Sequence, residues 1–270
     1  MGLSGKTEVE VQRLNDAGGV DSCRDAVVTE EPLEIRLDTT PVAVVMRTPG
    51  HDMELAVGFL FTEGILQDPD QVLSVAYCKD TTDEAAGNIV RVLAEGADLE
   101  AMEAARRQVY ASSSCGLCGK TTLDAVRLLV PPLQPIGPLK RSLLAGLPDT
   151  LRAHQDLFDS TGGLHAAALC STEGDLIVAR EDVGRHNACD KVLGSMILRE
   201  TWPLASRILV LSGRASFEMV QKAAMAGIGA IVAVSAPSSL AIEFAIEQGI
   251  TLVGFVRRGT MNVYSGDVVP

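Results

Sequence analysis

Residues 207–256 read RILVLSGRASFEMVQKAAMAGIGAIVAVSAPSSLAIEFAIEQGITLVGFV, and in this stretch short apolar runs alternate with longer segments of helical pattern. Strands that alternate with helices of this length indicate a mainly parallel sheet that is covered by helices on both faces. The stretch therefore predicts an α/β fold. The predicted elements, in order, are strand Arg207–Leu211, helix Ser216–Ala226, strand Ala230–Val234, helix Ser238–Glu247 and strand Thr251–Val256.

The alternation begins before this stretch and ends just after it. Two strands and a helix are predicted on its N-terminal side, and one more strand is predicted on its C-terminal side. These elements are strands Leu164–Leu169 and Leu176–Arg180, a helix near Gly184–Leu198, and a last strand near Met261–Tyr264.

The N-terminal part of the chain lacks this regular alternation and is predicted to form a smaller α+β domain. Residues 1–30 are polar, acidic and without periodicity, so we expect a loose tail there. Asp52 is a candidate N-cap for the first helix. The predicted elements are strands Leu33–Leu37, Val42–Arg47, Val72–Tyr77 and Asn88–Leu93, and helices Asp52–Ile65, Asp98–Arg107 and Thr121–Val130.

The best candidate for a linker is the turn-rich segment from Pro131 to Pro138, which is poor in charge. We place the domain boundary there. The predicted organisation is a loose tail over residues 1–30, an α+β domain over residues 31–134 with a mobile loop at 111–120, and a larger α/β domain over residues 135–270.

Composition and charge limit the classes of function. The 270 residues are 47% hydrophobic, which suffices for one large core or two modest ones. The net charge of −12 argues against general nucleic-acid binding, which needs a surplus of Lys and Arg. The uncharged run Ala223–Ile242 contains Gly, Pro and Ser, so it is a strand, turn and helix rather than a membrane span. We expect a cytoplasmic protein, because the N-terminus has no apolar signal segment.

The ends of the predicted parallel strands indicate where a ligand binds, because the crevice of such a sheet lies beyond their carboxyl ends. Three of the four loops there lead into helix N-termini, which favour anions, and three contain arginine, whose guanidinium matches phosphate. The alternative is that these residues are ordinary caps and turns. Since several arginines at one rim would repel each other without an anion, we predict a phosphorylated ligand such as a nucleotide. The loops are Glu181–Asn187, Ser212–Ser216, Ser235–Ser239 and Arg257–Thr260.

The segment Ser112–Lys120 contains two of the six cysteines, Cys115 and Cys118, at C-x-x-C spacing among serines and glycines. Such a polar, glycine-rich loop is not core, and its thiols are reactive or bind a metal. A flexible loop suits a sulfur that must visit two sites. In that role Cys115 would attack as a thiolate and carry a persulfide, and Cys118 would relay or resolve it.

Other chemistries fit this motif less well. A structural zinc site needs four ligands, but no second cysteine pair is present, and only the distant His165 or His186 could contribute. None of the four histidines belongs to the H-x-E element of the zinc deaminases. A thiol–disulfide oxidoreductase remains a competitor, although its motif usually opens a helix directly after a strand.

Taken together, these motifs resemble the formate dehydrogenase accessory sulfurtransferase family (FdhD). The resemblance extends from about residue 30 to 265 and is most specific in SSCGLCGK and EDVGRHNACDK. The matching segments are Thr48–Leu60, Ser113–Lys120, Thr161–His165, Glu181–Gly194, Ser212–Lys222, Ser235–Pro237 and Leu252–Phe255.

The resemblance implies a function and a set of partners. It implies a sulfur carrier that takes persulfide sulfur from a cysteine desulfurase and passes it to the molybdenum or tungsten bis(molybdopterin guanine dinucleotide) cofactor, before that cofactor enters formate dehydrogenase. The cofactor is cargo, and no permanently bound metal is expected. A non-catalytic chaperone of the same cofactor is the alternative. A homodimer is implied as well, without nucleic-acid or membrane partners.

The resemblance also implies a fold and site residues. The C-terminal domain would be a three-layer domain similar to cytidine deaminases but without their zinc signature. The persulfide would form on Cys115, with Cys118 as the second catalytic cysteine. The residues implied to contact the cofactor are Phe255, Val256, Arg257, Arg258, Gly259 and Thr260.

Four further residues have two interpretations from sequence alone. His51 and Asp52 are interpreted as a turn and a helix cap rather than a catalytic pair. Arg185 and His186 either contact the cofactor or belong to a polar network at a helix start.

Overall fold

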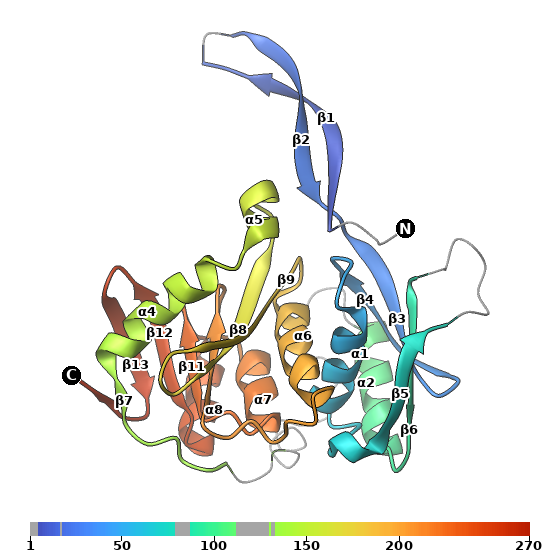
Figure 1. Ribbon diagram of the computed structural model, residues 1–270, viewed down its shortest axis with the longest axis vertical. Coiled ribbons are helices and arrows are strands. Elements are labelled where there is room, and N and C mark those ends of the chain that lie inside the picture. The colour runs from blue at the N-terminus through green and yellow to red at the C-terminus, as the bar shows by residue number, and fades with distance from the viewer. Residues whose placement is uncertain (1–4, 17, 79–86, 112–129, 131–132) are drawn as a thin grey trace.

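The computed structural model describes residues 5–16, 18–78, 87–111, 130 and 133–270. Within these residues the strands form two larger sheets, a two-stranded hairpin and a two-stranded pair (Figure 1). The larger sheets have six and four strands. The smallest pair joins β7 (Leu139–Lys140) in parallel to β14 (Val268–Val269), so the start and the end of the C-terminal half lie together.

The six-stranded sheet is mixed, so the prediction of a mainly parallel sheet is wrong. Its order is β13-β12-β11-β10-β8-β9, in which β10-β11 and β11-β12 are parallel and the other three pairings are antiparallel. Antiparallel pairing follows from short connections, because a parallel pair needs a long crossover. The strands are β8 (His165–Ser171), β9 (Leu176–Asp182), β10 (Arg207–Leu211), β11 (Ala230–Ala233), β12 (Thr251–Arg257) and β13 (Thr260–Ser265).

Helices cover both faces of this sheet, as predicted. Three of them bury alternate strand residues such as Leu209 and Ile231 on one face. On the other face one helix of the described part of the chain packs Leu144, Leu147 and Leu151 against the intervening residues. This is a three-layer α/β/α arrangement. The three helices are α6 (Arg185–Ile197), α7 (Phe217–Met225) and α8 (Ser239–Gln248), and the helix on the other face is α4 (Arg141–Arg152), followed by α5 (Asp156–Thr161).

The N-terminal half contains the four-stranded sheet, in the order β4-β3-β6-β5, together with two helices that share its core. The predicted strands of this half and its helices at Asp52–Ile65 and Asp98–Arg107 are confirmed, whereas residues 121–129 of the predicted helix Thr121–Val130 lie outside the described residues. Helix α1 ends three residues before the predicted Ile65, and α2 continues to Ala111. The elements are β3 (Glu31–Leu37), β4 (Thr40–Arg47), α1 (Asp52–Thr62), the 3-10 helix η1 (Pro69–Gln71), β5 (Val72–Tyr77), β6 (Ile89–Ala94) and α2 (Leu99–Ala111).

The expected loose tail over residues 1–30 is wrong for residues 6–28. These residues form a hairpin of β1 (Lys6–Leu14) and β2 (Val20–Val28), which extends away from the rest of the molecule (Figure 1). Most of its side chains are exposed, and Val11 and Cys23 are paired and half-buried. Hydrogen bonds between the strands therefore order a segment whose composition alone predicts disorder.

The two halves meet where α1 crosses α6 without side chains between their backbones. A Cβ atom on Gly194 would lie 1.8 Å from the carbonyl oxygen of Glu54. A Cβ atom on Gly58 would lie 1.9 Å from the carbonyl oxygen of Asp190. Real Cβ atoms do not approach so closely, and only glycine permits this crossing. The crossing fixes the N-terminal half against the sheet; the predicted domain limits at 31–134 and 135–270 stay predictions.

Candidate functional site

Four strands of the large sheet end at the same edge. Strands β10, β11 and β12 are parallel, and β9 runs in the same direction because it is antiparallel to β8, which is antiparallel to β10. The loops predicted to bind a ligand therefore do lie along one rim. Helices α6 and α7 begin at this rim without a side-chain cap, whereas Ser238 Oγ caps α8 by accepting from Ala241 N at 3.3 Å.

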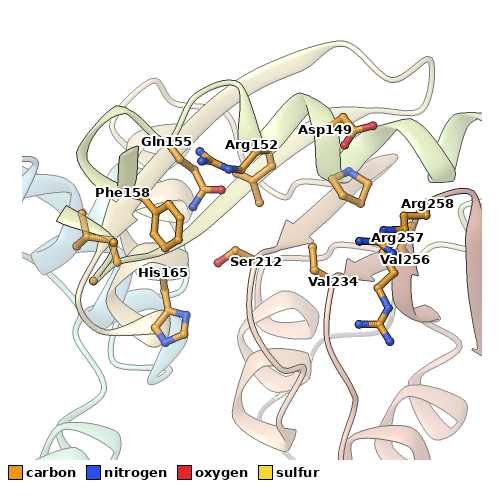
Figure 2. Close-up of a pocket in the computed structure, with 15 residues that line it drawn as sticks. Asp149, Arg152, Gln155, Phe158, His165, Ser212, Val234, Val256, Arg257 and Arg258 are labelled. Atoms are coloured by element: carbon orange, nitrogen blue, oxygen red, sulfur yellow. The ribbon is translucent and has the colours of Figure 1, made fainter. Parts of the chain in front are cut away.

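A cavity of about 700 Å³ opens at this edge (Figure 2). Ser212, Val234 and Val256 line it at the ends of β10, β11 and β12. Helices α4 and α5 supply the opposite wall, which includes Arg152 and Phe158. A volume of this size accommodates a nucleotide-sized ligand, and such edges are where α/β sheets bind ligands.

Two arginines from the turn between β12 and β13 line the cavity (Figure 2). Arg257 and Thr260 pair across this turn, and Arg258 and Gly259 between them have φ angles of 50° and 74°. Positive φ at both central positions is the geometry of tight hairpin turns, which favours Gly, Asn or Asp over arginine. The Arg141 guanidinium donates to the Gly259 carbonyl oxygen at 2.7 Å and holds the turn against α4. The strained Arg258 backbone thus presents a cationic side chain to the cavity.

Of the six residues predicted to contact the cofactor, the structure brings three to the cavity wall. Val256, Arg257 and Arg258 line it, whereas Phe255, Gly259 and Thr260 do not. The φ angle of Phe255 is 53°, at an irregularity where β12 departs from its pairing with β13. Contact between any of these six residues and a cofactor stays a prediction.

The wall made by α4 and α5 was missed by the sequence analysis, which predicts no helix between residues 141 and 161. The spacing of Leu144, Leu147 and Leu151 is an amphipathic signal that could have revealed α4. The carboxylate of Glu181 fixes α5 by accepting from the backbone N–H groups of Leu157 and Phe158 at 3.0 and 2.8 Å. Glu181 therefore positions the Phe158 side of the cavity.

Arg185 and His186 start helix α6 near the same rim. His186 Nε2 lies 2.7 Å from Glu218 Oε2 on α7, so this pair is a polar contact between two helix starts. The interaction with His186 lowers the pKa of Glu218, although burial opposes that shift. Neither Arg185 nor His186 lines the cavity. For His186 the geometry favours the polar-network interpretation.

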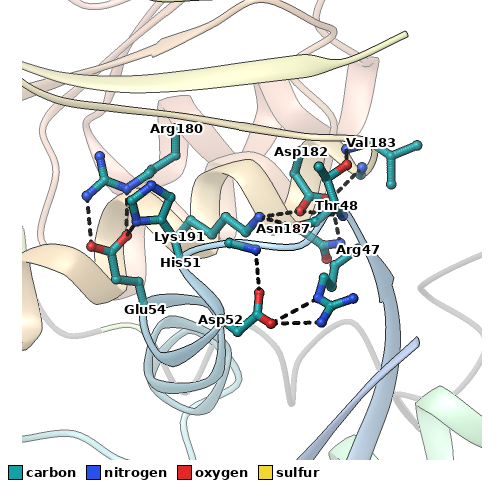
Figure 3. Close-up of polar contacts among 12 residues, drawn as sticks. Arg47, Thr48, His51, Asp52, Glu54, Arg180, Asp182, Val183, Asn187 and Lys191 are labelled. Carbon is teal, nitrogen blue, oxygen red and sulfur yellow. Dashed lines mark hydrogen bonds and ion pairs between the residues drawn. The ribbon is translucent and has the colours of Figure 1, made fainter. Parts of the chain in front are cut away.

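The matching segments Thr48–Leu60 and Glu181–Gly194 meet in a buried polar network (Figure 3). Asp182 and Lys191 form an ion pair at 2.7 Å with both side chains at most 1% exposed. Lys191 Nζ donates to the Thr48 carbonyl oxygen at 2.8 Å, and Thr48 N donates to Asp182 at 3.1 Å. These residues therefore connect the two halves of the molecule instead of facing a ligand.

His51 and Asp52 make polar contacts beside this network, and His51 Nδ1 lies 3.3 Å from Glu54 Oε2 (Figure 3). Asp52 Oδ2 accepts from Arg47 at 2.8 Å and from the Tyr77 hydroxyl at 3.1 Å, and Arg47 is fully buried. The predicted capping position is wrong by one residue, because His51 is the N-cap of α1 and Asp52 is its first residue. Asp52 Oδ1 accepts instead from Gly50 N at 3.1 Å.

Removal of the Lys191 charge is expected to destabilise the protein. Lys191→Met leaves the Asp182 carboxylate buried without its cation, which typically costs about 3 to 5 kcal/mol. Urea unfolding should show this loss in the free energy of unfolding. Lys140→Met, at an exposed lysine, is the control and should change stability little. Equal effects of the two variants would contradict this description of the network.

Cys115 and Cys118 lie outside the described residues, so the structure does not place them. Cys170 and Cys189 are buried as predicted, and burial raises the pKa of the Cys170 thiol to about 11 and that of Cys189 further. Among the described residues no cluster of three or more His, Cys, Asp or Glu side chains could hold a metal ion. None of the described helices is long and apolar enough to span a membrane.

Comparison with known proteins shows the family to which this chain belongs. Residues 28–268 match the model of the FdhD/NarQ family. The chain belongs to the FdhD/NarQ family. A relative from Streptomyces avermitilis, named sulfur carrier protein FdhD, is 51% identical in an alignment of 268 positions that covers 96% of this chain and 93% of the relative. A protein of the same name from Mycobacterium tuberculosis is 47% identical over 89% of this chain and 90% of its own length.

The fold also matches a solved structure. A protein from Desulfotalea psychrophila, described as a formate dehydrogenase accessory protein, aligns with a TM-score of 0.77 over 97% of this chain and 98% of its own. The sequence identity is 24%, so this match concerns the FdhD/NarQ fold alone. The mixed α/β architecture is therefore shared with that structure, while the likeness to cytidine deaminases stays a prediction.

Proposed function

We propose that this chain is a sulfur carrier of the FdhD kind. It accepts persulfide sulfur from a cysteine desulfurase and transfers that sulfur to the molybdenum or tungsten bis(molybdopterin guanine dinucleotide) cofactor, before formate dehydrogenase receives the cofactor. The name of the close relatives supports sulfur transport. The observation that carries the cofactor part is the cavity at the rim, lined by Arg152, Arg257 and Arg258 and large enough for a nucleotide moiety.

The sulfur is carried on Cys115. Its thiolate attacks the terminal sulfur of the desulfurase persulfide, a new S–S bond forms, and the desulfurase cysteine leaves as a thiolate. The terminal sulfur of the Cys115 persulfide then passes to the cofactor, whose metal would supply the two electrons that reduce this sulfur to a sulfide ligand, and the Cys115 thiolate is released. Cys118 lies three residues away and relays or resolves the persulfide. The chain works in the cytoplasm as a homodimer, and its C-terminal part is a cytidine deaminase-like domain.

The alternative is a cofactor chaperone whose cysteines carry no sulfur. The cavity favours this alternative as much as it favours the carrier, because it accounts for binding without any thiol. Expression of this chain in a bacterium that lacks its own FdhD protein tests the sulfur carrier and the chaperone together, because both functions predict an active formate dehydrogenase. Formate dehydrogenase activity should return. Formate dehydrogenase that stays inactive while this protein is present and folded would contradict both functions.

The cavity arginines are expected to bind the phosphates of the cofactor. Arg258→Ala should weaken binding of GDP, which carries the guanine and phosphates of the dinucleotide, by about tenfold, since a charge-assisted hydrogen bond contributes roughly 1.5 kcal/mol. Isothermal titration calorimetry measures the change. Arg199→Ala is the control, because Arg199 is exposed after α6 and does not line the cavity. GDP binding that is the same in both variants would exclude Arg258 from the site.

A further inference from the structure

His165 is the one histidine that lines the cavity within the described residues. It is the first residue of β8, opposite Asp182 of β9, and its ring lies at the end of the cavity near Phe158 and Gln155 (Figure 2). A Cβ atom on Gly213 would lie 3.2 Å from its Nδ1, so the loop after β10 comes close to the ring. Neither ring nitrogen has a hydrogen-bond partner in the part of the chain that the structure describes.

The charges around this imidazole are mainly positive. Burial lowers the pKa of His165, and the charges of Arg185, Arg214 and His186 lower it further, whereas Asp182 opposes them. These effects favour the neutral form of the imidazole. Arg185 and Arg214 make no ion pair with any described residue. Arg152, Arg257, Arg258 and Asp149 are the other charged groups on the cavity wall.

The nearby carboxylates have close partners of their own, among them Glu181, which accepts from the backbone of α5. Asp182 forms its ion pair with Lys191 at 2.7 Å. Glu218 lies 2.7 Å from His186. The end of the cavity beside His165 therefore has an imidazole on its wall, with the positive charges of Arg185 and Arg214 close to that imidazole but outside the cavity wall, and an anion that enters would favour the protonated ring.

We propose that His165 is the group through which this cavity takes up a proton on binding. As an anionic ligand enters, solvent protonates the imidazole, and the imidazolium donates a hydrogen bond to the ligand. This inference rests on the proposed function, which supplies a phosphate-bearing ligand for the cavity. It assigns the His165 end of the cavity to the phosphates and makes their binding dependent on pH.

The sign of that dependence follows from linkage. A bound anion raises the pKa of His165, so the complex holds more protons than the free protein between the two pKa values. Affinity therefore falls as the pH rises through this window. Each unit by which the ligand raises the pKa makes binding about tenfold tighter at the acidic end than at the alkaline end. The second phosphate ionisation of a nucleotide, near pH 6, acts in addition and needs a control.

Proton uptake can be measured by calorimetry of GDP binding at pH 7 in buffers of different ionisation enthalpy. The wild type should take up more protons per bound GDP than His165→Gln, and the ligand ionisation cancels in this difference. His154→Gln is the matched control, because His154 is exposed after α4 and does not line the cavity. It should behave like the wild type. Inorganic pyrophosphate should reproduce the uptake if phosphates alone are the cause.

A second measurement keeps the test decisive if a variant does not fold. The C2 proton signals of the four histidines, followed by NMR as the wild type is titrated, should show a higher pKa for His165 when GDP is bound. GDP binding without extra proton uptake and without this change would overturn the inference and leave the proposed function intact. Failure of both GDP and pyrophosphate to bind would overturn the inference together with the cofactor site.

Discussion

Replacement of Cys115 by alanine is expected to leave formate dehydrogenase inactive in cells that depend on this chain. Alanine has no sulfur, so the attack on the desulfurase persulfide cannot occur and no sulfur reaches the cofactor. Activity should fall to the level without any FdhD protein. The GDP affinity of Cys115→Ala should equal that of the wild type, because the residues that line the cavity are unchanged.

Cys23→Ala is the control for this experiment. Cys23 is half-buried in the hairpin of β1 and β2, outside the cavity, and the proposal gives it no function. It should retain full activity. A Cys115→Ala protein that still activates formate dehydrogenase would favour the chaperone alternative and exclude a persulfide at this position.

The second large effect is expected at the crossing of α1 and α6. Gly194→Ala places a methyl group 1.8 Å from the Glu54 carbonyl oxygen and 2.8 Å from Gly58 N, so the two helices must separate. Overpacking of this kind costs about 3 kcal/mol or more, which exceeds the gain of roughly 1 kcal/mol in helix propensity. Urea unfolding followed by circular dichroism should show a lower midpoint than in the wild type.

Gly146→Ala is the matched control. Gly146 also lies within a helix, α4, but beyond its chain neighbours and the backbone of its own helix no atom lies within 4 Å of a Cβ atom built there. The same substitution should therefore stabilise the protein by about 0.5 to 1 kcal/mol. A Gly194→Ala protein as stable as Gly146→Ala would contradict the close backbone contact.

The strands and helices of residues 31–111 and 164–265 follow from their periodicity, because burial on one face imposes a pattern on the sequence. Strand direction does not follow from periodicity. The segment between β8 and β9 contains only residues 172–175, which is too short for a parallel crossover, and this length could have predicted the antiparallel pair.

The hairpin of β1 and β2 shows a different limit. Its residues are mostly exposed, and on β1 only Val9 and Val11 alternate as half-buried apolar residues, which is too short a pattern to predict a strand. The pairing of Lys6 with Val28 through Leu14 with Val20 comes from the backbone, which composition does not reveal. A polar composition of this kind is compatible with a loose tail and with an exposed hairpin, so it did not distinguish between them.

The position of the ligand-binding rim could be predicted, because the order of strands and helices along the chain suffices to place the four strand ends at one edge of the sheet. The opposite wall of the cavity, made by α4 and α5, was not predicted, because the sequence pattern of α4, which carries Arg152, was not identified as a helix. Motif similarity also did not distinguish residues that contact a ligand from residues that stabilise the fold. Asp182 and Lys191 belong to the most specific motif, yet they are buried in an ion pair between the two halves.

The most direct test of the central claim is intact-protein mass spectrometry after incubation with a cysteine desulfurase and cysteine. The proposal predicts a mass gain of one sulfur atom in the wild type and none in Cys115→Ala. Treatment with a reductant should remove the added sulfur, because a persulfide is reducible. A sulfur adduct of equal yield in both proteins, or none in the wild type while a control acceptor is loaded, would contradict sulfur transport through Cys115.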